Sequence, residues 1–264
     1  MAVEIVEFKS WSGSVAEVFD AADLSGVLKA SGKDTVLIKP NWVSDQPPPV
    51  TTHVELVAAI VEYLRRKAPS AEVVVAEGTG MKDYDTAHVF KVLGALEMAE
   101  GAGVELVDLN GSGPLVHMAK PECRRWPEMW LPKIVMDSFV LSVPVLKAHS
   151  LSDVTLTMKN MMGAAPPKHF DAGSWRKSAF HADIHEAIFD LNLYRTPDFT
   201  LLDAVEGMAE AHLWGPECDP PPNKLAASAD PVAIDAWGCE VLGFDWRSIG
   251  HVRMADGVLG KAEA

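Results

Sequence analysis

Cysteine is scarce in this sequence. The chain has 264 residues and three cysteines, Cys123, Cys218 and Cys239, which are widely spaced and form no Cys-x-x-Cys pair. Cysteine-held zinc sites and iron–sulfur clusters need closely spaced thiols. We therefore expect no self-contained iron–sulfur cluster, and we expect buried or unreactive thiols instead.

Long apolar segments are also missing. No stretch approaches the roughly 20 apolar residues that a membrane-spanning helix requires. The first residues alternate between apolar and acidic side chains, which is unlike a signal peptide. These two absences predict a cytoplasmic protein without a membrane partner.

Basic residues are too few for a nucleic-acid-binding surface. The sequence has 23 Lys and Arg against 37 Asp and Glu, which gives a formal net charge of -14. Nucleic acids are bound through a basic surface that neutralises phosphates, so we expect no nucleic-acid partner. A local basic pocket for a small anionic ligand is still compatible with an acidic protein.

The apolar pattern predicts a single α/β domain over residues 1–264. Apolar runs rich in β-branched residues alternate with helical stretches, and the main expected strands begin near Thr35, Glu72, Phe139 and Phe199. This alternation is typical of a mainly parallel sheet with helices on both faces. Residues 111–132 are irregular, and we interpret them as an insertion or lid.

Polar side chains follow these strands at their carboxyl ends. The candidate ligand-binding residues at these positions are Lys39, Asn41, Glu77, Lys147 and Asp203, and His149 follows Lys147 closely. Ligands bind at this edge of an open α/β sheet. We therefore expect most of these side chains to form one cleft, with ordinary loop polarity as the alternative.

A short helix is expected after the Phe139 strand, opened by Ser152 or Asp153. It carries Lys159 and Asn160, which join the candidate site residues. The free N–H groups at the start of a helix favour phosphate or carboxylate. A solvent-exposed helix face is the alternative for Lys159.

Three residues are candidates for catalysis. His149 and His53 are expected to transfer protons, because imidazole titrates near neutral pH, and Lys159 is the candidate cation beside them. A histidine that only hydrogen-bonds to its own loop is the alternative for His149.

His181 and His185 are four residues apart on an expected helix. Two histidines on one helix face can ligate a metal ion, with an aspartate as an oxygen partner. The glutamate of a zinc-protease motif is absent here. A single histidine lining the cleft, or two structural histidines, are the alternatives.

Two shorter motifs have a local structural interpretation. Glu77-Gly-Thr-Gly80 resembles a phosphate-binding turn, although the full dinucleotide fingerprint is absent. Thr52 with Glu55 three residues later predicts a helix capping box.

Several motifs together resemble the domain-of-unknown-function family 362. They are Val36-Leu-Ile-Lys-Pro-Asn-Trp42, Thr51-Thr-His-Val-Glu55, Glu77, Val143-Pro-Val-Leu-Lys-Ala-His149, Val154-Thr-Leu-Thr-Met-Lys-Asn160, His181, Leu202-Asp-Ala-Val-Glu-Gly207 and Ala227-Ser-Ala-Asp-Pro-Val-Ala-Ile-Asp235. Many members of this largely uncharacterised family carry an attached ferredoxin-type segment. Since this chain lacks those cysteines, the resemblance implies a separate ferredoxin-type partner for any electron transfer.

His149 and Lys159 are also similar to a motif of the lactate racemase family. There a histidine is followed ten residues later by the lysine that carries a nickel-pincer cofactor. The surrounding residues differ, and the two-domain architecture of that family would not fit in 264 residues. This similarity implies a related fold and site position, not a cofactor.

Three functions follow from these observations. The first is an enzyme that acts on a small anionic molecule, with phosphate or carboxylate held by Lys39, Lys147 and Lys159. The second is a redox or iron–sulfur accessory protein with an external partner. The third is a non-catalytic ligand-binding protein. The reaction type, a bound metal or other cofactor, and the oligomeric state remain open at this level.

Overall fold

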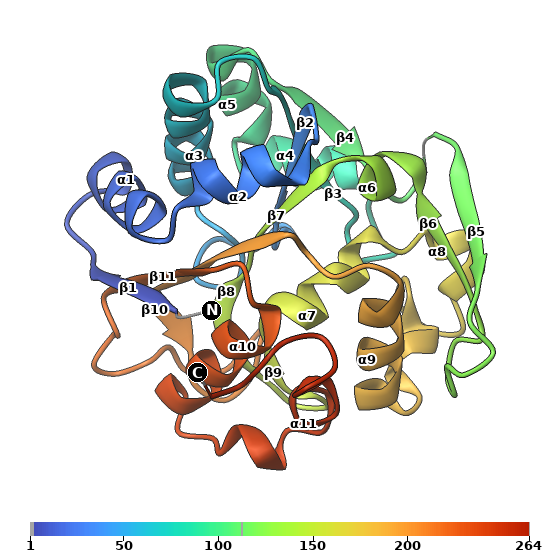
Figure 1. The fold of residues 1–264 in the computed structure, drawn as a ribbon. Coiled ribbons are helices and arrows are strands. Elements are labelled where there is room, and N and C mark those ends of the chain that lie inside the picture. The colour runs from blue at the N-terminus through green and yellow to red at the C-terminus, as the bar shows by residue number, and fades with distance from the viewer. Residues whose placement is uncertain (1–2, 112, 264) are drawn as a thin grey trace.

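The computed structural model describes residues 3–111 and 113–263, which form an α/β fold around one mixed, mostly parallel sheet (Figure 1). The strand order is β1 (Glu4–Glu7), β11 (Lys224–Ser228), β10 (Phe199–Met208), β7 (Phe139–Val143), β2 (Thr35–Pro40), β3 (Glu72–Glu77) and β4 (Glu105–Asp108). The strands from β10 to β4 run parallel, and β11 is antiparallel to both its neighbours. The predicted parallel sheet is therefore confirmed.

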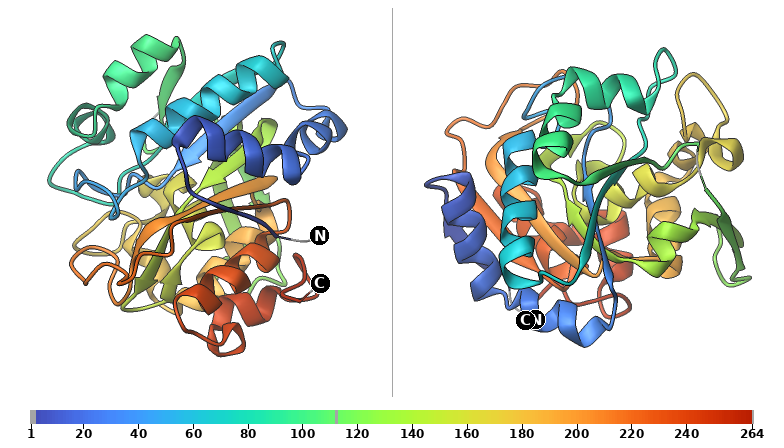
Figure 2. Two further views of the ribbon diagram at one scale, coloured as in Figure 1. Left: turned by 90° about the vertical axis from the view of Figure 1, so that its left-hand side faces the viewer. Right: turned by 90° about the horizontal axis from the view of Figure 1, so that it is seen from above.

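Helices cover both faces of this sheet, as predicted (Figure 2). One face carries α1 (Trp11–Ala21), α2 (Leu24–Ser31), α3 (Val54–Lys67), α4 (Thr86–Val92) and α5 (Ala95–Ala102). The other face carries α6 (Lys133–Asp137), α7 (Thr157–Asn160), α8 (Pro167–Phe170), α9 (Ile184–Tyr194), α10 (Pro231–Val241) and α11 (Gly250–Ala255), with 3-10 turns at Met161–Ala164, Ser178–His181 and Trp246–Ser248. Each layer has its own apolar core.

Successive side chains of a strand enter opposite cores. In β2, Leu37 packs with the α9 and α10 layer, whereas Val36 and Ile38 pack with the α1 and α3 layer. The same alternation places Leu202 and Leu201 of β10 in different cores. Within the apolar part of a strand, the parity of a residue therefore decides which core its side chain enters.

Pro144 separates two strands that the sequence predicts as one. After it, β8 (Val145–His149) pairs with β10 and turns back into β9 (Asp153–Thr155), which is antiparallel to β8. The predicted helix start at Ser152 or Asp153 is wrong, since Asp153 has a positive φ of 62° in the turn and the first helical residue is Thr157.

The predicted insertion contains an antiparallel hairpin of β5 (Leu115–Ala119) and β6 (Glu128–Pro132). It extends from the side of the molecule in Figure 1, and the buried residues Met129 and Leu131 attach it to the core. Ser112, also inside the predicted insertion, lies outside the described residues.

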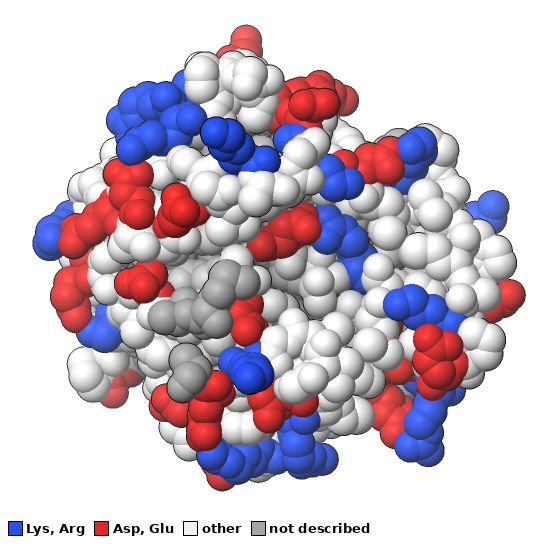
Figure 3. All heavy atoms as spheres, in the orientation of Figure 1, with Lys and Arg blue, Asp and Glu red and all other residues white. Residues whose placement is uncertain are grey.

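Acidic and basic side chains are interspersed over the face shown in Figure 3. Across residues 3–111 and 113–263, no helix combines the length and apolar character needed to cross a membrane.

Candidate functional site

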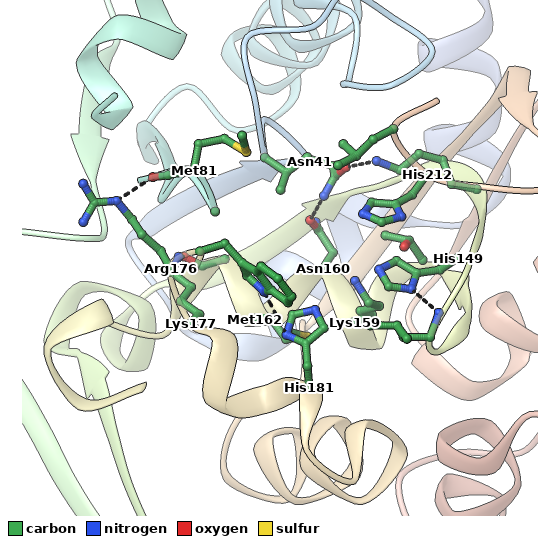
Figure 4. Close-up of a pocket in the computed structure, with 18 of the residues that line it drawn as sticks. Asn41, Met81, His149, Lys159, Asn160, Met162, Arg176, Lys177, His181 and His212 are labelled. Carbon is green, nitrogen blue, oxygen red and sulfur yellow. Dashed lines mark hydrogen bonds between the residues drawn. The ribbon is translucent and has the colours of Figure 1, made fainter. Parts of the chain in front are cut away.

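A cavity of about 320 Å³ opens beyond the carboxyl ends of β2, β3 and β8, on the side of α7 (Figure 4). Its basic lining residues are Lys147, Lys159, Arg176 and Lys177. Among the described lining residues, Glu77 is the sole acidic one. We call this site the basic cavity.

Most of the predicted site residues meet here. Asn41, Glu77, Lys147, His149, Lys159, Asn160 and His181 all line the basic cavity. Lys39 lies against it, because its ammonium contacts both Glu77 and Asn160. The expected convergence of strand ends therefore occurs for β2, β3 and β8.

Lys39 and Glu77 form a buried ion pair at the base of the cavity. The Lys39 Nζ atom lies 2.9 Å from both carboxylate oxygens, and it also donates to the Asn160 Oδ1 atom at 3.3 Å. The Glu77 carboxylate accepts further hydrogen bonds from the N–H groups of Trp42 and Gly78. Burial lowers the pKa of Lys39, and the charge of Glu77 opposes that shift. Glu77 is therefore fully engaged within the protein.

Gly163 packs directly on this ion pair. An added Cβ atom would lie 2.2 Å from Glu77 Oε1 and 2.5 Å from Lys39 Nζ. At Gly78, an added Cβ atom would lie 2.8 Å from Lys177 Nζ and 2.4 Å from Asn110 Oδ1. Close packing with these side chains explains why residue 78, the first glycine of the Glu77-Gly-Thr-Gly80 turn, is a glycine.

Asn41 and Lys147 connect the ends of β2 and β8. The Lys147 ammonium donates to Asn41 Oδ1 at 2.5 Å and to the Val50 carbonyl at 2.7 Å. The Asn41 amide in turn donates to Asn160 at 3.0 Å. Burial, and then the charge of Lys159, lower the pKa of Lys147 to about 7.

Thr52 also ties strand ends together, so the predicted capping box is wrong. Its hydroxyl accepts from the Asn41 N–H and donates to the Val143 carbonyl. Helix α3 begins at Val54 without a side-chain cap. Because the Thr52 hydroxyl hydrogen-bonds to the ends of two parallel strands, it does not cap α3.

Lys159 belongs to α7, and a residue of another helix fixes the start of α7. The buried carboxylate of Asp235, on α10, accepts hydrogen bonds from the Thr157 and Met158 N–H groups, at 2.7 Å and 3.1 Å. Within the described residues, the Lys159 ammonium has no hydrogen bond or ion pair. Burial lowers its pKa to about 7. Asp235 therefore fixes the first turn of the helix that carries Lys159.

Lys177 is a site residue that the sequence analysis missed. Its ammonium donates to the carbonyls of Gly78 and Gly163, both at 2.7 Å. Burial lowers its pKa to about 7. The neighbouring Arg176 is fixed by a hydrogen bond to the Met81 carbonyl. Both residues belong to a loop without a strand-end signal, so no local pattern marks them.

Three histidines surround the inner part of the cavity. The rings of His149 and His212 stack with centroids 3.8 Å apart, and His181 lies 6.3 Å from His149 (Figure 4). Burial and nearby Lys159 lower the pKa of all three imidazoles, to about 4 for His181 and about 3 for His212. All three rings are therefore neutral near pH 7. His212, which follows β10 in an irregular loop, has no sequence signal of its own.

The His149 ring has a defined tautomer. Its Nδ1 atom accepts hydrogen bonds from the Leu151 and Ser152 N–H groups, at 3.0 Å and 3.2 Å. In the neutral ring the proton is therefore assigned to Nε2. His149 has a donor available at that atom, which is a useful property for proton transfer.

His53 and Asp203 do not line the basic cavity. Asp203 has the same strand parity as Leu201, so its side chain reaches the α1 and α3 face. There, burial raises its pKa to about 6, with His53 opposing that shift. His53 Nε2 lies 3.4 Å from Glu206 Oε2 on this other face.

His185 is separated from His181, so the two histidines do not share one helix face. His181 ends a 3-10 turn, whereas His185 lies in α9, and Asp183 between them has a positive φ of 52°. The His185 Nδ1 atom lies 3.0 Å from that of buried His251. Within residues 3–111 and 113–263, no group of three or more His, Cys, Asp or Glu side chains is placed to hold a metal ion.

The match with a family model covers the elements that build this site. Residues 36–240 match the family described as Domain of unknown function (DUF362). The match includes every strand end and loop that contributes to the basic cavity. No curated protein gives a significant match to the chain. Since the family model covers well over half of the sequence, the protein belongs to the DUF362 family.

Proposed function

We propose that the protein is an enzyme that binds a small anionic molecule, carrying a phosphate or carboxylate, in the basic cavity. The observation that carries this proposal is the partner-free Lys159 ammonium in a cavity whose one described acidic residue is already paired with Lys39. Even partial burial of an unpaired cation is costly. A bound anion would remove that cost.

Two further lysines each have one N–H donor that makes no hydrogen bond within the described residues. An ammonium group has three N–H donors. Lys147 and Lys177 each use two of them on protein acceptors, whereas Lys159 uses none. These free donors support recognition of an anion by several short hydrogen bonds, which are strengthened by the positive charges.

Neutral imidazoles beside these cations support acid–base chemistry. His149 offers an Nε2 donor, and His181 and His212 line the same cavity. A bound anion favours protonated rings, so it would move their lowered pKa values back toward neutrality, where a histidine works best as an acid or base.

A thermal-shift panel of phosphorylated and carboxylated metabolites tests the proposal. A ligand at 100 times its Kd stabilises a folded protein by about 2.7 kcal/mol. Lys159→Met should abolish the shift while remaining folded, because the ammonium has no partner within the described protein. Lys91→Met, at an exposed position of α4, should retain the shift.

The same panel separates this function from its alternatives. Conversion of a stabilising metabolite, followed by mass spectrometry and lost in His149→Gln, supports an enzyme. Binding without conversion indicates a ligand-binding protein instead. Visible absorbance of the purified protein, with no stabilisation by any anion, would favour the redox accessory function.

A further inference from the structure

Four lysine ammonium groups gather at the basic cavity, and one differs from the others. Lys39 is paired with Glu77, and Lys147 and Lys177 are each fixed by two oxygen acceptors. Lys159 has no acceptor within the described residues, although its side chain is partly buried and lines the cavity. Figure 4 places it near the rings of His149 and His181.

An amine in this setting is suited to nucleophilic attack. Burial lowers the pKa of Lys159 to about 7, so a large share of the group carries a free lone pair near neutral pH. Lysines activated by desolvation, or by a neighbouring cation, form Schiff bases with carbonyl compounds. Burial is the cause at Lys159, and the charge of Lys159 in turn contributes to the lowered pKa of Lys147.

The groups around Lys159 match the needs of imine formation. This reaction requires a donor to the carbonyl oxygen and a base that accepts the proton lost by the amine. The Nε2–H group assigned to His149 is such a donor, and the neutral rings of His181 and His212 are such bases. The free N–H of Lys147 can hold a carboxylate beside the reacting carbon.

We propose that Lys159 forms an imine with the carbonyl carbon of a 2-oxo carboxylate, an inference that rests on the proposed function. The neutral Nζ atom attacks the carbonyl carbon while the His149 Nε2–H group donates a hydrogen bond to the carbonyl oxygen. A neighbouring neutral imidazole, of His181 or His212, takes the proton that the nitrogen loses and passes it to that oxygen. The resulting carbinolamine then loses its hydroxyl with a proton as water. The net change joins amine and ketone into imine and water, without oxidation or reduction.

The cavity wall also indicates the size of the oxo acid. Met81, Leu151, Met162, Trp175 and Trp214 line it beside the lysines, and Trp214 is 73% exposed. An apolar substituent on the carbonyl carbon would lie against these side chains. Phenylpyruvate should therefore react more readily than pyruvate or glyoxylate.

Reductive trapping of the full-length chain tests the imine. The protein is incubated separately with glyoxylate, pyruvate and phenylpyruvate in the presence of cyanoborohydride, and then analysed by intact mass and peptide mapping. We expect one added oxo acid less one oxygen atom, located at Lys159. At oxo acid concentrations well below saturation, where the free protein sets the rate, labelling should increase with pH with a midpoint at about 7. Surface lysines should instead have a midpoint at about 10.

Control variants and a control ligand show whether the label is specific to Lys159. Lys159→Arg should remain unlabelled, Lys91→Arg should label like the parent, and lactate, which lacks the carbonyl, should compete with pyruvate. Stabilisation by lactate without trapping of any of the three oxo acids at Lys159 overturns the imine but leaves anion binding intact. Labelling spread over surface lysines also overturns it. If no oxo acid is trapped at Lys159, and if no anion of the metabolite panel stabilises the protein, both proposals are refuted.

Discussion

Single residues in the basic cavity differ in how much freedom the fold leaves them. Lys39 and Glu77 saturate one another, so they form the base of the site rather than its reactive part. Lys159 lines the same cavity and has no such partner among the described residues. The same residue type thus has a structural role at one position and a free ammonium at another, and the difference is set by the acceptors within reach.

Gly163→Ala should destabilise the protein strongly. The new Cβ atom would approach Glu77 Oε1 to 2.2 Å and Lys39 Nζ to 2.5 Å, so the buried ion pair would have to separate. Breaking such a pair costs about 3–5 kcal/mol. Urea denaturation followed by circular dichroism measures the change in the free energy of unfolding.

Gly101→Ala provides the matched control. It lies in α5, where an added Cβ atom meets nothing within 4 Å. Alanine in a helix is favoured over glycine by about 1 kcal/mol, so this variant should be as stable as the parent or slightly more so. Equal stability of the two variants would contradict the close packing at Gly163.

Elements from distant parts of the chain hold the cavity in shape. Helix α7 is capped by Asp235 of α10, and α9 contacts α11 through His185 and His251. His251 is fully buried, and burial followed by the charges of His185 and Lys159 lowers its pKa to about 3. Asp153 of β9 and Arg253 of α11 lie near His185, where they act on its pKa in opposite directions.

This buried histidine should make the protein sensitive to acid. The unfolded chain takes up a proton at His251 near pH 6.5, whereas the folded protein does so near pH 3. The unfolded state therefore binds more protons between these values, and stability is lost as the pH falls below 6.5. The loss attributable to His251 by pH 5 should be about 2 kcal/mol.

His251→Gln tests this by removing the titrating ring. Denaturant unfolding at several pH values between 5 and 7 should give a shallower loss of stability than in the parent. His117→Gln, at a half-exposed position of β5, should keep the parent slope. An unchanged slope in His251→Gln would show that His251 is protonated in the folded state.

At the scale of the whole molecule, a chain of net charge -14 surrounds a cavity whose described lining has more basic than acidic residues. Lys147, Lys159 and Lys177 each have a pKa of about 7, because burial disfavours their charged forms. A bound anion favours the charged forms and raises these pKa values. The proposed binding of an anion would therefore be coupled to proton uptake at these lysines.

Lactate binding should take up protons at pH 7.5. The lysines are partly neutral there, and affinity should fall as the pH rises further. Titration calorimetry in Tris and in Hepes measures the uptake, since these buffers differ in ionisation enthalpy. Identical binding enthalpies in the two buffers would mean that the lysines are already charged before lactate binds.

The sequence alone was sufficient to predict the sheet and much of the site. Apolar β-branched runs such as Val36-Leu-Ile38 are stable only as buried strands, and polar residues at their carboxyl ends must then lie at one edge. Lys39, Glu77 and Lys147 were found in this way. These predictions depended on local patterns that survive folding unchanged.

Only the tertiary structure decided which side chains share the cavity. Asp203 also follows an apolar run, but strand parity directs it to the opposite face. The turn at Asp153 replaced a predicted helix by a hairpin, and the break at Asp183 separated His181 from His185. Lys177 and His212 reach the site from irregular loops, because contacts such as those of Lys177 with the Gly78 and Gly163 carbonyls fix their positions. Long-range hydrogen bonds of this kind leave no periodic trace in the sequence, so they appear only once the chain is folded.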